Sequence, residues 1–585
     1  ICQVSMHLIR PHITKVIGTL LEQMSVLEPA AFNYIQLNAD KYNVSQEQLE
    51  SMRMSMAQSG PINDIISTCA RHIDEEVCDT LVPRVVDILR SGVGLPTRTA
   101  TAKFIGDLGK FHSQAIVKKH VPTLLTAVMR TVQTTSSSVE KKVLASSLPY
   151  VLKNAKVSQG KIVLQQILNL YIQNNDEGKS EEAHYASGML MDGIARHVPA
   201  IIKRFNELVL PVIFVARHDE SKRVSTIWES VWEECMTTSP KDTIRLYIEP
   251  VADTCIQLLN HQSWKMKKQG GQGLNEIGLL LNIDINQAQR NKIITNLLSN
   301  IPGRVWEGKE ILLEALASVC ESFKKDVNCE NEEQGALLNK VLHVALRECN
   351  RNNIVFKLQA LSCLRRILKV PLFERMMDEE MFTLARNTLN ECQQVVQSPE
   401  DASKKEAESP VESSSKDSSG TMSLERKKEE KQKEDIMCQT IELTPLIIPS
   451  NHVALFEREI DLLTEQLSSL RLSVSVASSL LNALLTLVSC VLSGAAETQQ
   501  ALLTPQRTYR FIELLMMQTD PAIRQVLIRT KAFETFGDFL KLLKQQRADL
   551  LEQVEPQTTN LLQDAINKEK DIAVQSKYST LLNIL

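Results

Sequence analysis

Apolar residues recur along most of this chain at intervals of three and four positions, the spacing that places them on one face of an α-helix. The first helix-like stretch shows this pattern at Val4, Leu8, Ile9, Ile13, Val16, Ile17 and Leu20. Aromatic residues make up only 4% of the sequence and glycine is sparse, a balance that favours helices over strands and hairpins. The sequence therefore predicts an all-α fold.

The helical pattern is itself repeated. Residues 81–111 predict a first helix with an early proline, a turn with two glycines and then a second helix, and this arrangement returns further along the chain. Prolines of successive first helices lie about 40 residues apart, with one gap about twice as long, which is the period of HEAT repeats. Proline fits the start of a helix, where its missing N–H costs no hydrogen bond. We therefore expect a HEAT-repeat α-solenoid. The prolines are Pro83, Pro122, Pro211 and Pro250.

One segment interrupts the repeats. Residues 398–437 mix Ser, Lys and Glu with few apolar residues, so they cannot bury enough surface to offset the entropy lost on ordering. The sequence thus predicts a HEAT-repeat solenoid over 1–397, a disordered charged Ser-rich insert over 398–437 and C-terminal helical repeats over 438–585. Ser398 and Ser409, each followed by proline, are candidate phosphorylation sites.

Net charge and cysteine content limit the cellular compartments and the classes of partner that we expect for this protein. The formal net charge of −4 creates no global field that would draw the protein to nucleic acid or an anionic membrane. The 12 cysteines show no zinc-site spacing and follow no secretory signal, so we expect a reducing compartment, cytosol or nucleus. The uncharged stretch between Arg471 and Glu497 is long enough to cross a bilayer. It contains several serines, and we expect a buried helix of the solenoid there and no membrane span.

No catalytic motif stands out. The sequence lacks a phosphate-binding P-loop, a paired-histidine zinc helix and a nucleophile elbow, so we expect no enzyme activity, no cofactor and no metal. Gly270, Gly271 and Gly273 could approach a phosphate, but they lie in a second-helix pattern, where glycine favours close packing of a neighbouring helix. His112 and His120 are too far apart to share a helix face, and we interpret them as surface or core groups.

Two groups of residues are candidates for partner binding. A basic residue recurs near the start of each second helix; salt bridges between repeats are the plainer interpretation, and an acidic partner is the alternative. Lys265, Lys267 and Lys268 form the candidate basic cluster. Trp228 and Trp232 share one helix face, either as core filling or as an exposed partner anchor. The basic residues are Arg98, Lys142, Lys222, Arg223, Lys265, Lys309 and Lys357.

Four segments carry a family resemblance: SGVGLPTRTATAKFIGDL, TIWESVWEEC, SWKMKKQGGQGLNEIGLLL and NIPGRVWEGKEILLEALASVC. They resemble the C-terminal portion of the proteasome adaptor and scaffold family, which are giant HEAT-repeat proteins. The chain also opens at Ile1 inside a helical pattern, with no initiator methionine, so we expect it to be the C-terminal part of something larger.

The resemblance implies a non-catalytic scaffold that binds the regulatory and core particles of the 26S proteasome. Such a scaffold would tether, stabilise or quality-control the proteasome and link it to vesicle or motor proteins. It would act in cytoplasm and nucleus and associate with endosomes, endoplasmic reticulum or centrosome. The resemblance supplies no site residues.

Two other protein classes remain open from the residues alone. A HEAT-repeat nuclear transport receptor would bind cargo and a small GTPase on an acidic inner face, which the basic second helices argue against. The regulatory helical part of a large kinase or ubiquitin ligase would need a catalytic domain outside this chain.

Overall fold

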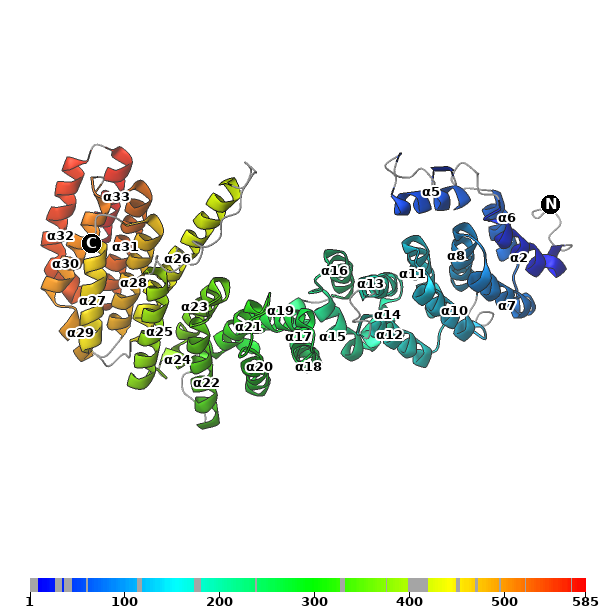
Figure 1. The fold of residues 1–585 in the computed structure, drawn as a ribbon, viewed down its shortest axis with the longest axis horizontal. Coiled ribbons are helices and arrows are strands. Elements are labelled where there is room, and N and C mark those ends of the chain that lie inside the picture. Colours follow the sequence, from blue (N-terminus) through cyan, green and yellow to red (C-terminus); the bar gives the residue numbers. More distant parts are fainter. Residues whose placement is uncertain are drawn as a thin grey trace, which may run out of the picture. The chain divides into compact units, whose positions relative to one another are not determined.

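The computed structural model describes most of the chain in helices. The described residues are 9–26, 34–35, 41, 45–58, 61–112, 118–172, 180–236, 239–326, 332–374, 376–397, 419–448, 453–468, 472–493, 496–520, 522–569 and 571–585. Within these ranges every element is an α-helix or a short 3₁₀ helix and no strand occurs (Figure 1). The all-α prediction is confirmed. Ser398 and Ser409 lie outside the described residues.

The chain divides into two compact units, Ile1–Leu258 and Leu259–Leu585. This division does not coincide with the boundaries at 397 and 438 that composition suggests, and those boundaries remain a prediction. The elements of the first unit are η1 Arg10–His12, α2 Ile13–Gln23, α5 Gln46–Gln58, α6 Pro61–Ala70, α7 Glu75–Ser91, α8 Leu95–Phe111, α10 Val121–Thr134, α11 Ser138–Leu152, α12 Val157–Ile172, α13 Ser180–His197, α14 Pro199–Arg204, α15 Asn206–Ala216, α16 Lys222–Cys235, α17 Pro240–Leu246 and α18 Ile248–Leu259.

The second unit continues the helical pattern to the end of the chain. Its elements are α19 Trp264–Leu281, η2 Asn282–Asp284, α20 Gln287–Asn300, α21 Glu310–Cys320, η3 Glu321–Lys325, α22 Glu332–Cys349, α23 Ile354–Leu368, α24 Pro371–Glu374, α25 Glu379–Gln397, α26 Ser419–Ile447, α27 Val453–Ser468, α28 Val474–Ser493, α29 Ala496–Leu502, α30 Pro505–Thr519, α31 Val526–Gln546, α32 Ala548–Lys568 and α33 Ile572–Ile584.

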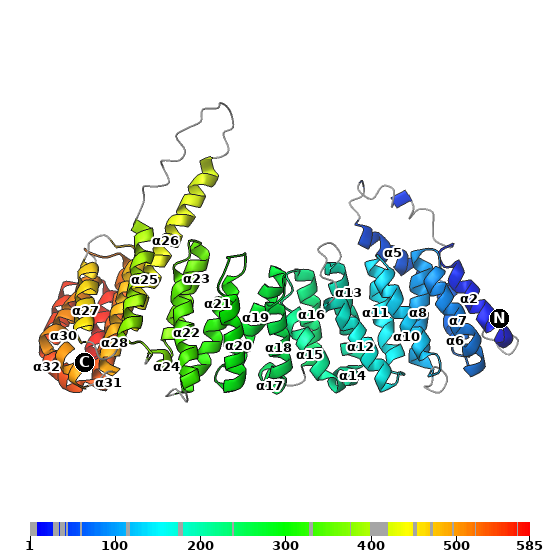
Figure 2. The same ribbon diagram turned by 60° about the horizontal axis from the view of Figure 1, so that its bottom comes forward.

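Within each unit the helices pair as first and second helices of successive repeats. In the first unit α8, α11, α13 and α16 are the second helices, each in contact with the next (Figure 2). In the second unit α19, α21 and α23 play the same part. Apolar side chains of both helices are buried between the repeats, which is how a repeat that cannot bury its own hydrophobic face becomes stable. The solenoid prediction is confirmed.

The prolines do not all begin their helices as expected. Pro122 is the second residue of α10 and Pro250 the third of α18, whereas Pro83 and Pro211 lie inside α7 and α15. The helix containing Pro83 starts earlier because the Asp74 carboxylate caps it, accepting a hydrogen bond from the Val77 N–H at 3.0 Å. A cap upstream thus overrides the preference of proline for the first turn.

The predicted disordered insert is wrong over residues 419–437, which belong to α26. Its first part, 398–418, lies outside the described residues. Two properties explain the helix. Lys, Glu and Gln have high helix propensity, and further along α26 Ile441 and Leu443 are buried where it packs against α23, α25 and α28. The beginning of α26 extends past the ends of its neighbours (Figure 2).

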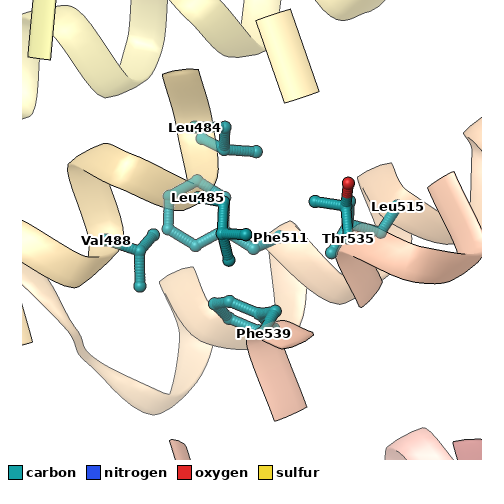
Figure 3. A pocket seen from close by; sticks show the side chains of 7 residues that line it. All are labelled: Leu484, Leu485, Val488, Phe511, Leu515, Thr535 and Phe539. Carbon is teal, nitrogen blue, oxygen red and sulfur yellow. The ribbon is translucent and has the colours of Figure 1, made fainter. Parts of the chain in front are cut away.

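The uncharged stretch near the C-terminus forms α28, the core helix of the last repeats. By length and composition α28 is the one described helix that could cross a membrane, yet more than half of it, 56%, is buried inside the unit. Its Leu484, Leu485 and Val488 line a small apolar pocket together with Phe511 of α30 and Thr535 of α31 (Figure 3). The buried-helix interpretation therefore fits α28 without a bilayer.

Candidate functional site: the second helices and the loop before α21

Glycines set the distance between neighbouring second helices. A Cβ added at Gly109 of α8 would lie 2.6 Å from the Tyr150 carbonyl oxygen of α11, and one at Gly193 of α13 would lie 2.5 Å from that of Ala145. In α19, a Cβ on Gly271 would lie 2.6 Å from the Leu312 side chain. Gly270, Gly271 and Gly273 are all buried inside α19, so the close-packing interpretation of this stretch is confirmed.

Trp228 and Trp232 are not exposed anchors. Their exposed fractions are 0% and 4%, and Trp228 stands edge-on to the Tyr171 ring, with 5.4 Å between centroids. The Arg217 guanidinium covers Trp232, 4.6 Å from the ring centroid. The alternative of a partner anchor is wrong for both, because repeat packing takes up the whole face on which they lie.

A polar network surrounds Trp228 inside the first unit. The Asp219 carboxylate accepts hydrogen bonds from the Tyr171 hydroxyl at 2.9 Å and contacts His184 Nδ1 at 3.0 Å. Its other oxygen accepts from the Ser221 N–H at 2.9 Å. The network links α12, α13 and the turn before α16. We interpret it as structural, because buried polar groups need partners of this kind.

The basic ladder exists in the first unit as salt bridges between second helices. Arg98 Nη2 of α8 lies 3.1 Å from the buried Glu140 carboxylate of α11. The Glu182 carboxylate of α13 forms salt bridges with Lys141 Nζ at 3.2 Å and with Arg223 Nη1 at 2.6 Å. The salt-bridge interpretation is confirmed for Arg98 and Arg223. These cations are therefore engaged within the solenoid.

The histidine pair does not form a site. His120 Nε2 lies 2.7 Å from Asp79 Oδ1, whereas His112 contacts the backbone of Ala70, and burial lowers its pKa. Among the described residues no group of three His, Cys, Asp or Glu side chains could hold a metal ion.

The predicted basic cluster begins α19 in the second unit. Lys265 is exposed and its ammonium lies 5.5 Å from the centroid of the Trp264 ring, which is itself 38% exposed. Lys267 is half-buried and donates to the Asn300 side-chain oxygen at 3.3 Å. Lys268 is half-buried as well. The cluster is thus only partly a surface feature.

Lys268 helps to shape the turn that follows α20. A Cβ on Gly308 would lie 2.7 Å from Lys268 Cδ, so a larger residue at this position would displace the Lys268 side chain. Gly308 has φ 91° and Gly303 has φ 98°, and both values favour glycine over any L side chain. The two glycines let residues 301–308 fold back over the start of α21.

Lys309, a predicted member of the basic ladder, is buried beneath this loop. It is 1% exposed, and its ammonium donates to the carbonyl oxygens of Pro302 at 3.3 Å and Arg304 at 3.0 Å. Lys357 of α23 is also buried, at 4% exposed. The alternative of an acidic partner is wrong at these two positions, because both side chains are buried and closed to a partner.

The electrostatic setting of Lys309 is unusual. Burial is the largest cause that lowers the pKa of its ammonium, and the positive charges of Arg351, Lys267 and Arg347 lower this pKa further. The Glu348 carboxylate raises it. Several cations thus meet around one carboxylate, a feature that the linear sequence does not reveal.

Comparisons with known proteins agree on one family. Residues 9–172 match the model of the HEAT-repeat domain of the proteasome adapter and scaffold protein ECM29, and residues 308–583 match that of the ECM29 C-terminal ARM-like repeats. The chain is 31% identical over 369 residues to the human proteasome adapter and scaffold protein ECM29, covering 62% of this chain and 19% of that protein. The identity to the proteasome component ECM29 of Saccharomyces cerevisiae is 23% over 362 residues, covering 62% and 19%.

Solved structures with a similar course include Kap121p bound to RanGTP, with 13% identity and a TM-score of 0.41, covering 98% of this chain and 57% of that one. Importin beta gives 10% identity and a TM-score of 0.40, covering 98% and 77%. The chain spans about a fifth of the length of the curated relatives. Because the two matching models together take in most of its residues, the chain belongs to the ECM29 family of proteasome adapter and scaffold proteins.

Proposed function

We propose that this chain is part of a non-catalytic scaffold that binds the 26S proteasome. The observation that carries the proposal is the pair of family matches, over residues 9–172 and 308–583, to proteins named proteasome adapter and scaffold. A row of stacked repeats suits this role, because it offers an extended surface on which several subunits can be held at once. The transport-receptor alternative is not favoured, since both matching models describe proteasome adapters.

The finer parts of the proposal concern partners and location. The scaffold would contact both the regulatory and the core particle, tether or stabilise their assembly, and connect it to vesicle or motor proteins. It would act in cytoplasm and nucleus, with a share at endosomes, endoplasmic reticulum or centrosome. Phosphorylation of Ser398 and Ser409 would add negative charge to the segment between α25 and α26, and mass spectrometry of the purified protein tests for it.

The exposed part of the basic cluster at the start of α19 is the proposed contact. Lys265 is exposed there and Lys268 is partly exposed, and attraction to an acidic partner surface would weaken as salt rises. Lys267 is less suited to a test, because its bond to Asn300 supports the fold.

Co-purification tests the proposal directly. The tagged chain is incubated with assembled proteasomes, and the bound subunits are measured across a salt series. Wild type should retain proteasomes, and K265E with K268E should lower the retained amount and flatten the salt dependence. A matched control reverses two exposed lysines of the first unit that lie outside the basic ladder, Lys156 and Lys161, and should leave retention unchanged.

Cross-linking in the same samples names the subunits that lie against the second unit. If the wild-type chain retains no proteasomes at any salt concentration, the proposed function is wrong for this chain. If both charge reversals retain proteasomes equally and melt at the wild-type temperature, the α19 cluster is not the contact.

A further inference from the structure

Cations from three successive repeats lie near enough to Lys309 for their charges to act on it. Lys267 comes from α19, Lys309 from the start of α21, Arg347 from the end of α22 and Arg351 from the turn that follows α22. The positive charges of Lys267, Arg347 and Arg351 all act on the Lys309 ammonium. Such a meeting of like charges is costly unless something compensates it.

The described carboxylates at this place do not balance these charges. Glu348 is fully buried, and its carboxylate forms salt bridges with both arginines, with Arg351 Nε at 2.8 Å and Arg347 Nη2 at 3.2 Å. Glu307 and Glu310 flank Lys309 in the sequence, but neither is among the charges that dominate its pKa. Glu391 of α25 accepts a hydrogen bond at 2.7 Å from Asn350, which lines the adjoining groove. Four cations, Lys267, Lys309, Arg347 and Arg351, therefore outnumber the two carboxylates, and we call these four residues the α21 basic site.

The α21 basic site opens to solvent on one side. The Arg347 side chain is 56% exposed and that of Arg351 is 33% exposed. Arg347 also lines a groove between α22 and α25, with about 710 Å³ of empty space, part of it open. Leu384 of α25, 40% exposed, lines the same groove. An incoming segment can thus meet a cation and an apolar side chain together.

We propose that the α21 basic site and the adjoining groove bind an acidic peptide segment that carries an apolar side chain. The carboxylates of the segment would accept hydrogen bonds from the exposed faces of Arg347 and Arg351, and its apolar residue would contact Leu384. This assignment deepens the proposed function and rests on it in one respect, that the segment belongs to a proteasome-associated partner.

Charge favours a short acidic peptide over nucleic acid. The chain as a whole carries a net charge of −4, so a long polyanion gains nothing from the rest of the protein. The basic site is local, built by two half-exposed arginines over a buried lysine. Carboxylate pairs fit the forked guanidinium group well, because arginine can donate two parallel hydrogen bonds to them.

Direct binding of a probe peptide tests the assignment without proteasomes. The probe is a short fluorescein-labelled peptide of glutamates with one central leucine, and its matched control replaces every glutamate by glutamine. Fluorescence anisotropy with the full chain should show saturable binding of the glutamate probe that weakens with salt. R347Q should lower the affinity about tenfold, the usual effect of one charge-assisted hydrogen bond. Arg351 still holds Glu348 in this variant.

K340Q is the matched control, because Lys340 is exposed on the same helix and its loss changes the net charge equally. It should leave the affinity within a factor of about two, the change expected of one distant exposed charge. L384D should weaken binding of the glutamate probe without altering the melting temperature of the chain.

Three results would overturn the assignment: no saturable binding to the wild type, equal losses in R347Q and K340Q, or tighter binding of a single-stranded oligonucleotide of equal charge that displaces the probe. If the probe binds as expected while proteasomes do not co-purify, the site stands and the proposed function falls.

Discussion

Replacing Gly109 by alanine tests whether glycine sets the spacing of second helices. Gly109 is buried in α8, and a Cβ at this position would lie 2.6 Å from the Tyr150 oxygen and 2.8 Å from the Val151 nitrogen of α11. Both obstacles are backbone atoms, so no side chain can rotate away. The Asn154 amide locks the contact further, donating to the Gly109 oxygen at 2.8 Å and to the Tyr150 oxygen at 3.0 Å.

Two opposing effects set the size of the change. Overpacking a tightly packed interior costs about 1–3 kcal/mol, and contact with backbone places this case at the upper end. Alanine gains about 1 kcal/mol over glycine in a helix interior. The net expectation for G109A is a loss of about 2 kcal/mol, which corresponds to roughly a 30-fold increase in the local opening constant.

Hydrogen exchange measured by mass spectrometry is the right assay, because a solenoid opens repeat by repeat and a single melting temperature would average the effect. Peptides from α8 and α11 should exchange about 30-fold faster in G109A, the factor that follows from about 2 kcal/mol. The control is G335A in α22, where a Cβ would meet nothing within 4 Å. That substitution should slow local exchange by up to about fivefold, since only the propensity gain applies.

The prediction is that the two substitutions change the local exchange rate in opposite directions. If G109A slows exchange in α8, or if both substitutions act alike, then close backbone approach does not decide the residue at this position. The reasoning from helix spacing would then be refuted for the other second helices too.

Three further predictions follow from buried groups. The Thr535 hydroxyl has no hydrogen-bond partner among the described residues, so T535V should stabilise α31 against hydrogen exchange by about 1–3 kcal/mol, the cost of a buried unsatisfied group. Burial lowers the pKa of Lys309 in the folded chain, so between that pKa and the ordinary value of 10.5 the unfolded chain binds more protons and stability should rise with pH. The rise is isolated by subtracting the melting temperature of K309M from that of the wild type at each pH. A difference that does not change with pH would contradict the prediction. W228A should destabilise α13 and α16 by about 3–5 kcal/mol in hydrogen exchange, whereas an exposed anchor would lose only partner binding.

Helix periodicity allowed most of the fold to be predicted from the residues. The repeat length, the helix pairs and the close-packing role of the α19 glycines all follow from local spacing and propensity, and each is seen in the structure. Capping changes the details. A proline pattern alone suggests that Pro83 begins a helix, but the carboxylate of Asp74 begins it more than one turn earlier.

The early part of α26 shows why composition alone led to the wrong prediction of disorder there. Few apolar residues occur between 419 and 435, so that stretch alone gives no reason to fold. Helix formation is cooperative, however, and propagates from the buried segment around Ile441 into residues that are good helix formers. A composition window that stops at 437 separates the helix from the core that stabilises it.

Lys309 could not be distinguished from Arg98 by sequence. Both stand near the start of a second helix after glycines, but Arg98 reaches Glu140 of the next repeat at 3.1 Å whereas Lys309 is buried under its own loop. The difference depends on the backbone: the short turn before Arg98 has one glycine with positive φ, Gly94, whereas the longer turn before Lys309 has two and folds back over the lysine. Which cations remain available is therefore a property of loop geometry.

This difference explains where binding should concentrate in a solenoid of this kind. In regular repeats the glycines, tryptophans and ladder cations are used by the neighbouring repeat, because each unit contacts only the units beside it. The face of Trp228 is closed to partners in this way, and the cations beside Glu182 are paired across repeats. A repeat that departs from the pattern leaves groups unmatched. The loop before α21 is such a departure: it buries Lys309, and Arg347, whose charge acts on Lys309, has a side chain that is 56% exposed. Recognition by this scaffold should accordingly depend on its irregular repeats, and charge changes there should affect binding more than equal changes on the regular ladder.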